Sequence, residues 1–389
     1  MTEIAHGAVH VLGGEAILSR WWRTLDKGVL AAVTLLFAIG LLLGFAASVP
    51  LAERNGLEPF HYVQRQAVFG LIAFAVMFVT SMMSPHMVRR LAVLGFGVAL
   101  AALMLLPILG TDFGKGATRW YSLGFASVQP SEFLKPVFII VTAWLMAAGA
   151  EPNGPPGRTI SFALLGLIVG FLALQPDFGQ AMLTIVAWSA IYFVAGAPIA
   201  VLTAVVGVVG AAGVMAYQTS EHFARRIDGF LSPEVDPRTQ MGYAIDAIRE
   251  GGFLGVGVNE GRVKWTLPDA HTDFIIAVAA EEYGLLMVLF ITALFALIAA
   301  RCLLRLCVER DMFIRLAGTG LTVLLSSQAL INLGVAVRLL PAKGMTLPFV
   351  SYGGSSLVAM GLLVGMLLCF TRSRPQGEIG DHLLSNGFR

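Results

Sequence analysis

The stretch GVLAAVTLLFAIGLLLGFAASVPLA, residues 28–52, contains no charged side chain over 25 positions. A helix of this length spans the roughly 30 Å of hydrocarbon in a bilayer at about 1.5 Å per residue. It also exceeds the roughly 7 to 15 apolar residues of a signal-peptide core, although basic residues from Arg20 to Lys27 precede it. We therefore expect a retained transmembrane helix here.

The composition extends this expectation to the whole chain. Of the 389 residues, 57% are hydrophobic and 13% are charged, with a formal net charge of +2. Soluble domains carry about 25% charged residues, so a cytosolic globular enzyme is excluded. The chain has no basic run that would indicate nucleic-acid binding. Its three cysteines (Cys302, Cys307 and Cys369) are too few for a metal cluster or a disulfide framework.

Uncharged runs recur along the sequence, and in lipid each must form a helix to pair its own backbone groups. The run 178–220 is too long for one helix and divides at Gly196-Ala197-Pro198. We predict an all-α integral membrane protein with ten transmembrane helices. Their approximate ranges are 28–52, 66–85, 91–111, 133–150, 159–176, 178–196, 198–220, 274–300, 316–337 and 344–371.

An even number of helices puts both termini on one side. Basic residues favour the cytoplasmic side, thirteen against seven, once the long loop 219–273 is set aside. We expect cytoplasmic termini and a large periplasmic loop, 219–273, between the seventh and eighth helices. The expected parts are a cytoplasmic segment 1–27, a membrane domain 28–372 and a cytoplasmic tail 373–389.

His271 and Asp273 end the long loop where the eighth helix should begin. A carboxylate at a helix start most often caps free N–H groups. A carboxylate partly removed from water at the membrane boundary can instead hold a proton and act as a general base. The local sequence leaves both interpretations open.

Glu281 and Glu282 lie roughly 12 to 14 Å further along this helix. Ionisable residues inside a span are costly and are by default functional or paired. A proton or ion path and a structural hydrogen-bond anchor are the two alternatives. We favour the anchor, because adjacent residues on a helix point in different directions.

Before the fourth helix, Glu132 and Lys135 are three residues apart and share a helix face, with Arg119 upstream. One interpretation is an ion pair within the helix. The other is an anion site, in which lysine supplies a point charge and arginine a bidentate clamp.

The segment 340–356 combines serines with paired glycines at a helix start. Its backbone N–H groups could approach a phosphate. Small residues also allow close helix packing, which we favour for this segment taken alone. Asp177 has the pattern of a cap and turn between the fifth and sixth helices.

Together these segments resemble the SEDS family (shape, elongation, division and sporulation) of bacterial cell-wall enzymes. Four signatures occur in the family's order: Arg119-Trp120 leading to QPSE at 129–132, QPDFG at 175–179, HTDF at 271–274 with EEYG at 281–284, and LPFVSYGGSS at 347–356. The resemblance covers residues 26–372. Lys343 in the motif PAKG is similar to the division-type branch, while Ala342, Tyr283 and Arg338 depart from common family residues.

The resemblance implies a peptidoglycan glycosyltransferase that polymerises lipid II, a disaccharide-pentapeptide on undecaprenyl pyrophosphate. It implies action at the outer face of the bacterial inner membrane, at the division septum, and makes Asp273 the essential aspartate. An inverting transfer needs a base on the acceptor hydroxyl and charge stabilisation of the departing pyrophosphate. We expect Asp273 to be the base, and Arg119, Lys135 and Lys343 to hold the pyrophosphate with Glu132 orienting Lys135.

No cofactor is expected except a divalent cation, Mg²⁺ or Mn²⁺, that could share this task; its ligands are not predicted. The expected partners are lipid II, a class B penicillin-binding transpeptidase and other divisome proteins. The remaining site residues are His271, Ser351, Gly353, Gly354 and Ser355 for substrate binding, with Asp177, Glu281 and Glu282 supporting.

Two alternative functions are a lipid II flippase and a scaffold that recruits the transpeptidase. Transporters tend to show paired broken helices in two halves, which the sequence does not reveal.

Overall fold

The structure is a computed structural model that describes residues 17–111, 118–124, 126–232, 236–267, 269–341 and 344–373. These residues form thirteen α-helices, one short 3-10 helix and one small hairpin. In chain order the elements are α1 (Ile17–Thr24), α2 (Lys27–Arg54), α3 (His61–Met82), α4 (Pro85–Leu109), β1 (Tyr121–Ser122), β2 (Ser127–Val128), α5 (Pro130–Ala148), α6 (Gly157–Leu174), α7 (Phe178–Val194), α8 (Ile199–Thr219), α9 (Glu221–Leu231), α10 (Gln240–Gly251), η1 (Val263–Trp265), α11 (Ile275–Cys307), α12 (Met312–Ala336) and α13 (Gly354–Thr371).

Among the described helices, nine are long and apolar enough to cross a membrane, namely α2 to α6, α8 and α11 to α13. The apolar helix α7 has 17 residues. It is separated from α8 where the sequence predicted, because Gly196 adopts a φ of 67° and Pro198 precedes the next helix. The predicted membrane-spanning helical fold is confirmed.

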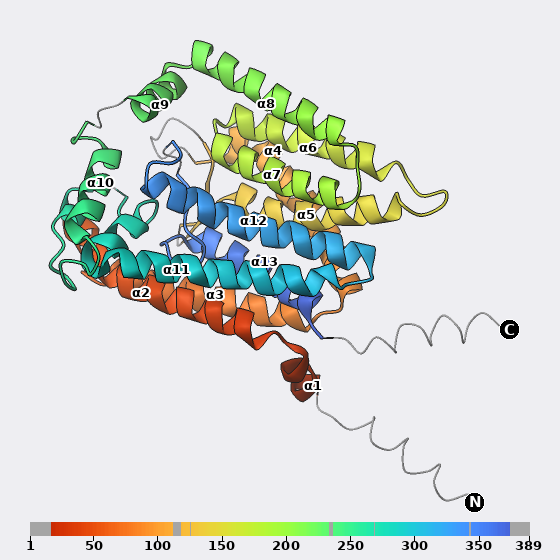
Figure 1. Cartoon of the computed structure of the whole chain (residues 1–389), viewed down its shortest axis with the longest axis horizontal. Coiled ribbons are helices and arrows are strands. Elements are labelled where there is room, and N and C mark those ends of the chain that lie inside the picture. The colour runs from red at the N-terminus through yellow and green to blue at the C-terminus, as the bar shows by residue number, and fades with distance from the viewer. Residues whose placement is uncertain are drawn as a thin grey trace, which may run out of the picture.

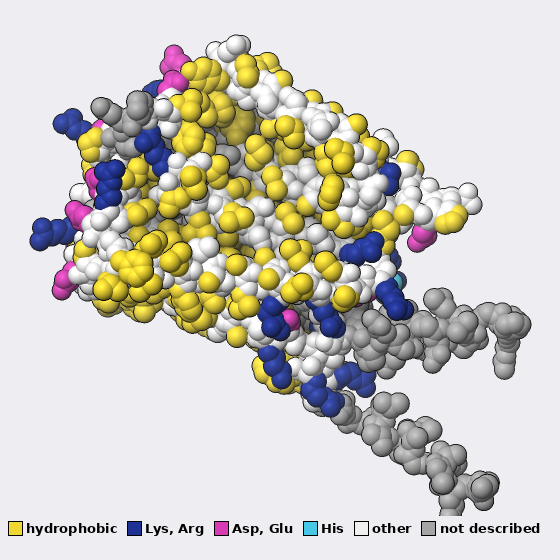
Figure 2. All heavy atoms as spheres, viewed as in Figure 1, with side chains coloured by type: hydrophobic (Ala, Val, Ile, Leu, Met, Phe, Trp, Pro, Cys, Tyr) yellow, Lys and Arg dark blue, Asp and Glu magenta, His cyan; other side chains and the backbone are white. Residues whose placement is uncertain are grey.

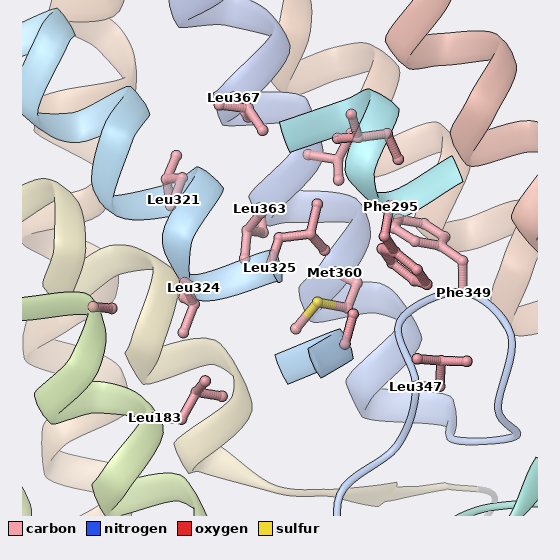
Figure 3. Packing of buried hydrophobic residues seen from close by; sticks show 14 of the residues in the cluster. Leu183, Phe295, Leu321, Leu324, Leu325, Leu347, Phe349, Met360, Leu363 and Leu367 are labelled. Carbon is pink, nitrogen blue, oxygen red and sulfur yellow. The ribbon is translucent and has the colours of Figure 1, made fainter. Parts of the chain in front are cut away.

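The centre of the bundle is formed by α5, α12 and α13, between a layer of α2, α3 and α11 and a layer of α4, α6, α7 and α8 (Figure 1). Their facing side chains make one continuous apolar core, shown around Leu325 and Met360 in Figure 3. Helices α3 and α13 touch along their backbones, because a Cβ on Gly361 would lie only 2.3 Å from the carbonyl oxygen of Ala73. At the edge, α8 buries none of its side chains.

Both ends of the described chain meet at one end of the bundle. The N–H of Ser373 donates to the carbonyl of Thr24 at 2.9 Å, and Nε of Arg372 donates to Oγ1 of Thr24 at 3.1 Å. Figure 2 shows a broad hydrophobic surface with the charged side chains gathered toward its two ends. Because α13 ends here, Gly354 at its start lies at the opposite end.

Three features differ from the expectation. The uncharged run from Gly344 becomes helical only at Gly354, since Pro348 offers no N–H donor and Phe349 has a positive φ of 63°. Helix α11 extends to Cys307 and is broken at Gly284, whose φ is 77° and ψ −175°. The loop before α5 holds the hairpin β1–β2, so the described chain is helical with one antiparallel pair.

Candidate active site

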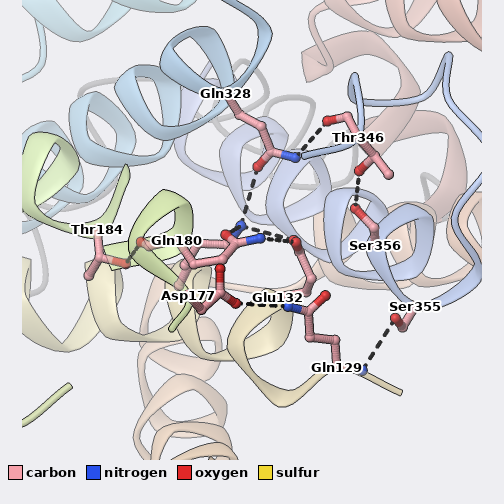
Figure 4. Close-up of polar contacts among 10 residues, drawn as sticks. Gln129, Glu132, Asp177, Gln180, Thr184, Gln328, Thr346, Ser355 and Ser356 are labelled. Carbon is pink, nitrogen blue, oxygen red and sulfur yellow. Dashed lines mark hydrogen bonds and ion pairs between the residues drawn. The ribbon is translucent and has the colours of Figure 1, made fainter. Parts of the chain in front are cut away.

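A buried polar cluster lies where α5, α7 and α12 meet (Figure 4). Lys135 is 2% exposed, and its Nζ donates to Oε2 of Glu132 at 2.9 Å, to Oε1 of Gln328 at 3.3 Å and to Oε1 of Gln180. Gln180 donates in turn to Oε1 of Glu132 at 2.6 Å. All three N–H donors of the ammonium are therefore used. Such hydrogen bonding is what makes a buried ion pair tolerable.

Two amide side chains of α12, one turn apart, hold the loop that leads to α13. Nε2 of Gln328 donates to the carbonyl of Thr346 at 3.1 Å, and Nδ2 of Asn332 donates to the carbonyl of Met345 at 2.7 Å. The hydroxyl of Thr346 is 2.8 Å from that of Ser356 on α13. The loop is thus fixed at two consecutive residues.

Asp273 lies beside this loop, directly before α11, and is partly exposed. Nδ2 of Asn332 donates also to the main-chain oxygen of Asp273, at 3.2 Å. A Cβ built on Gly344 would lie 3.3 Å from Oδ2 of Asp273. One amide side chain therefore joins the carboxylate's segment to the loop that contacts the buried cluster.

An aromatic cluster adjoins Asp273. The buried ring of His271 lies 5.6 Å from the ring of Tyr62 on α3 and 5.5 Å from that of Tyr352, centroid to centroid. The N–H of Tyr352 donates to the carbonyl of His271 at 2.9 Å. Burial raises the pKa of the Tyr352 phenol above its ordinary value, so the hydroxyl stays protonated and can donate at neutral pH.

Asp177 occupies the N-cap position of α7, where its sequence pattern places it, but its side chain makes no capping hydrogen bond. Its Oδ2 accepts a hydrogen bond from Nε2 of Gln129 at 3.1 Å. The N–H of Gln129 donates to Oγ of Ser355, at 3.4 Å, at the start of α13. Asp177 and Ser355 therefore lie on either side of the start of α5.

Arg119 closes the end of α6. Its Nε donates to the carbonyl of Gln175 at 3.0 Å and its Nη2 to the carbonyl of Pro176 at 2.7 Å. Burial raises the pKa of the Asp177 carboxyl above its ordinary value, and Arg119 is the strongest influence in the opposite direction. The guanidinium thus belongs to the same electrostatic neighbourhood as the buried cluster.

The serine and glycine segment before α13 packs into the bundle. Oγ of Ser351 accepts a hydrogen bond from the N–H of Leu347 at 2.9 Å, and both residues are buried. Gly353 is the N-cap of α13, and a Cβ on Gly354 would lie 2.9 Å from the ring of Phe69. This geometry favours close packing over a phosphate cradle.

Glu281 and Glu282 hold the long loop against α11. Oε1 of Glu281 accepts from the N–H of Arg262 at 2.6 Å. Nζ of Lys264 lies 2.6 Å from Oε1 of Glu282, and both side chains are almost completely buried. These contacts favour the structural anchor over a proton path.

The structure thus brings Glu132, Lys135 and Asp177 together on one side of the loop, and His271 with Asp273 on the other. Lys343 lies outside the described residues. The residues that sequence reasoning missed are the connecting polar side chains, Gln180, Gln328, Asn332 and Thr346. A signal for two of them was present, because Gln328 and Asn332 are amides four residues apart in an apolar helix and so share one face.

Comparison with known proteins identifies the family of the chain. The FtsW/RodA/SpoVE family, described as cell cycle proteins, matches residues 27–376. A probable peptidoglycan glycosyltransferase FtsW of Caulobacter vibrioides is 41% identical over 385 residues, which cover 97% of this chain and 98% of that protein. A protein of the same name from Alkalilimnicola ehrlichii is 36% identical over 361 residues, 89% of each chain.

Solved structures show the same fold. A chain from a peptidoglycan synthase complex that coordinates polymerization and crosslinking matches with a TM-score of 0.74 and 28% identity, covering 91% of this chain and 100% of that one. The rod shape determining protein RodA of Thermus thermophilus matches with a TM-score of 0.65 and 26% identity, covering 91% and 99%. With its four sequence signatures and its FtsW relatives, the chain belongs to the FtsW/RodA/SpoVE family of cell cycle proteins, the SEDS family, and is of the FtsW type.

Proposed function

We propose that this chain is a peptidoglycan glycosyltransferase that polymerises lipid II during septal cell-wall synthesis. The printed names of its relatives support the reaction class. The chain would cross the inner membrane ten times, with α7 as one crossing. An even number agrees with the contact between Thr24, before α2, and Ser373, after α13. Arg301, Arg305 and Arg372 cluster at that end, which we assign to the cytoplasm. Asp273, at the opposite end, would face the periplasm.

One observation carries the proposal most directly. Asn332 bonds both to the segment of Asp273 and to the loop that Gln328 connects to Lys135. A partly exposed carboxylate is therefore held in a fixed relation to a cluster of polar and cationic groups. Catalysis of glycosyl transfer needs such a pairing, with a base at the acceptor and positive charge at the leaving group.

In the proposed step, Asp273 takes the proton from the 4-hydroxyl of the acceptor sugar. The new bond forms between that oxygen and the anomeric carbon of the donor, with inversion to the β-1,4 linkage. The bond from the anomeric carbon to the pyrophosphate oxygen breaks, and undecaprenyl pyrophosphate leaves with the electron pair. Asp273 then returns its proton to water.

The pyrophosphate would lie near Lys135 and Arg119, and Lys343 remains a proposed third cation. At Lys135, the longest contact is the 3.3 Å hydrogen bond to Gln328, so this is the bond a phosphate oxygen would replace. Glu132 would keep Lys135 oriented during the exchange. Arg119 uses two of its five N–H donors on the carbonyls of Gln175 and Pro176, directly after α6, and can turn others to an anion.

The described residues do not bring together three His, Cys, Asp or Glu side chains that could hold a metal ion. A divalent cation could still arrive bound to the pyrophosphate of lipid II. Strand synthesis measured in EDTA, and again after Mg²⁺ or Mn²⁺ is restored, tests this.

The break in α11 at Gly284 bears on the alternative of a flippase, because discontinuous helices are typical of transporters. Here the break is filled by the long loop. The N–H groups of Val256 and Leu285 donate to the carbonyls of Glu281 and Gly252, respectively. This hydrogen bonding stabilises a fixed junction, which fits an enzyme better than alternating access.

One experiment separates the candidate functions. The purified chain, with its class B penicillin-binding transpeptidase, is given labelled lipid II in detergent, and the glycan products are resolved on a gel. Detergent removes the distinction between the two sides, so a polymerase yields strands. A pure flippase and a pure scaffold both yield none, and absence of strands would overturn the proposal.

A further inference from the structure

A groove of about 630 Å³ runs along the outer face of α2, at the end of the bundle where Thr24 meets Arg372 and Ser373. It begins at Trp22 and Lys27 and continues between side chains spaced by three or four residues, which therefore lie on one helix face. The full lining is Trp22, Lys27, Leu30, Ala31, Thr34, Leu35 and Ala38.

The head of the groove is held rigidly by α1. Nε1 of Trp21 donates to Oγ of Ser81 at 3.1 Å, and the Trp21 ring contacts that of Phe78 edge-on at 5.8 Å. The next residue, Trp22, is 46% exposed, and Nζ of Lys27 lies 5.5 Å from the centre of its ring. The Lys27 ammonium therefore lies over the Trp22 ring, directly before the uncharged run that begins at Gly28.

The charge at this position is positive. Arg20 and Lys27 are exposed. The neighbouring carboxylate in the chain, Asp26, is committed, because its Oδ1 caps α2 by accepting from the N–H groups of Gly28 and Val29 and both of its oxygens bind Arg301. An anionic group is therefore the complementary ligand.

The length of the groove indicates what the apolar part of the ligand is. From Lys27 to Ala38 the helix rises roughly 16 Å, about the thickness of one leaflet of hydrocarbon. The alanines leave a shallow channel, and the only hydroxyl in it, that of Thr34, donates to the carbonyl of Leu30 in its own helix. A transmembrane helix of a partner would need a channel across both leaflets, whereas an acyl chain needs one.

We propose that this groove binds one anionic phospholipid of the adjacent leaflet. Its phosphate would lie against Lys27 and Trp22, and one acyl chain would lie along Ala31 and Ala38. The lipid would be a structural ligand at the end of the molecule away from Asp273, independent of the glycosyl transfer.

The test is native mass spectrometry of the delipidated full chain in detergent, titrated with phosphatidylglycerol or with phosphatidylcholine. We expect one phosphatidylglycerol to bind at least about fivefold more tightly than phosphatidylcholine, the effect of one basic side chain near an anionic headgroup. Lys27→Gln should abolish this preference. Ala31→Trp should fill the groove and remove the tightest-bound lipid of either kind.

Arg90→Gln is the matched control, because Arg90 is an exposed base near the start of α4 that does not line the groove. It should keep the preference for phosphatidylglycerol. Equal binding of the two lipids by the unmodified chain would overturn the proposal. So would equal losses in Lys27→Gln and Arg90→Gln, or a tightly bound lipid retained by Ala31→Trp. Thr34→Phe fills the same groove and replaces Ala31→Trp if that variant does not fold.

Discussion

The side-chain amide of Asn332 donates to the main-chain oxygen of Asp273, 3.2 Å away, and to that of Met345, 2.7 Å away. The carboxylate that we propose as the base is therefore positioned by a residue 59 positions later in the chain. Asn332 is buried, so this positioning is not in competition with bulk water.

Asn332→Leu keeps the branched shape of the side chain, with a larger volume, and removes both hydrogen bonds. Small displacements of a catalytic group can cost about a hundredfold in rate, so we expect polymerisation to fall between about tenfold and a hundredfold. The measurement is strand synthesis from lipid II, with thermal unfolding as a check on the fold. Thr322→Val is the control, because the Thr322 hydroxyl donates to the carbonyl of Gly318 in its own helix and its other side-chain contact is Cys302 of α11. Equal rates in the two variants would contradict a positioning role.

The buried pair of Glu132 and Lys135 predicts a non-additive effect on stability. Glu132→Gln or Lys135→Met alone leaves one charge buried without its partner, which costs about 3 to 5 kcal/mol. The double variant removes both charges and should lose less than the sum of the two. Thermal unfolding of the three variants in detergent measures this coupling.

The exposed ion pair of Asp26 and Arg301 is the comparison for the buried pair of Glu132 and Lys135, because the Arg301 side chain is 47% exposed. Asp26→Asn keeps a good helix cap and loses only a screened interaction, so the expected change is below about 1 kcal/mol. Additive single and double variants at Glu132 and Lys135 would show that the buried pair is not coupled.

Gly284 predicts a site where an added methyl group is not tolerated. Its φ of 77° and ψ of −175° lie in a region that is essentially restricted to glycine, and a Cβ would lie 2.3 Å from the carbonyl oxygen of Phe253. Gly284→Ala should lower the midpoint of thermal unfolding clearly. Gly207→Ala in α8, where a Cβ would meet open space beyond the helix's own backbone, should not lower it. Similar midpoints for both variants would contradict this account of the break.

The membrane-spanning fold could be predicted from the sequence because lipid leaves a run such as 28–52 few alternatives to a helix. The helix ends could not be predicted in the same way. Arg65 and Arg89 lie near the starts of α3 and α4, so both helices begin before the charged residues that the sequence suggested as their limits. The break at Gly284 was also missed. Its backbone groups are satisfied by a loop some thirty residues earlier, and no local pattern encodes that contact.

The candidate site was partly predictable for a similar reason. Charged residues in an apolar chain are conspicuous, so Glu132, Lys135 and Asp273 stood out. The amides that connect them did not, because Gln328 and Asn332 bind backbone carbonyls of an irregular loop. Only the fold shows that this loop passes between the two groups of charges.

Asp177 predicts a pH dependence of stability. Burial raises its pKa above the ordinary value of 3.8, so over the interval between the two values the folded state holds more protons than the unfolded state. Its contribution to stability is present below that interval and is lost as the pH rises through the raised pKa. Asp177→Asn can still accept from Gln129 and cannot ionise.

The unfolding midpoint of Asp177→Asn should therefore fall less than that of the unmodified chain between about pH 4 and pH 8. Thermal unfolding at several pH values measures the difference. An unchanged pH dependence would contradict the raised pKa of Asp177.

The most direct test of the central claim compares Asp273→Asn with Asp269→Asn in strand synthesis from lipid II, in the presence of the transpeptidase. Asp269 is a carboxylate of the same segment with a positive φ of 55°, which asparagine accepts readily. If Asp273 is the base, Asp273→Asn folds and binds the transpeptidase but forms no glycan strands, whereas Asp269→Asn polymerises at a near-normal rate. Strand synthesis by Asp273→Asn at a near-normal rate would contradict the account.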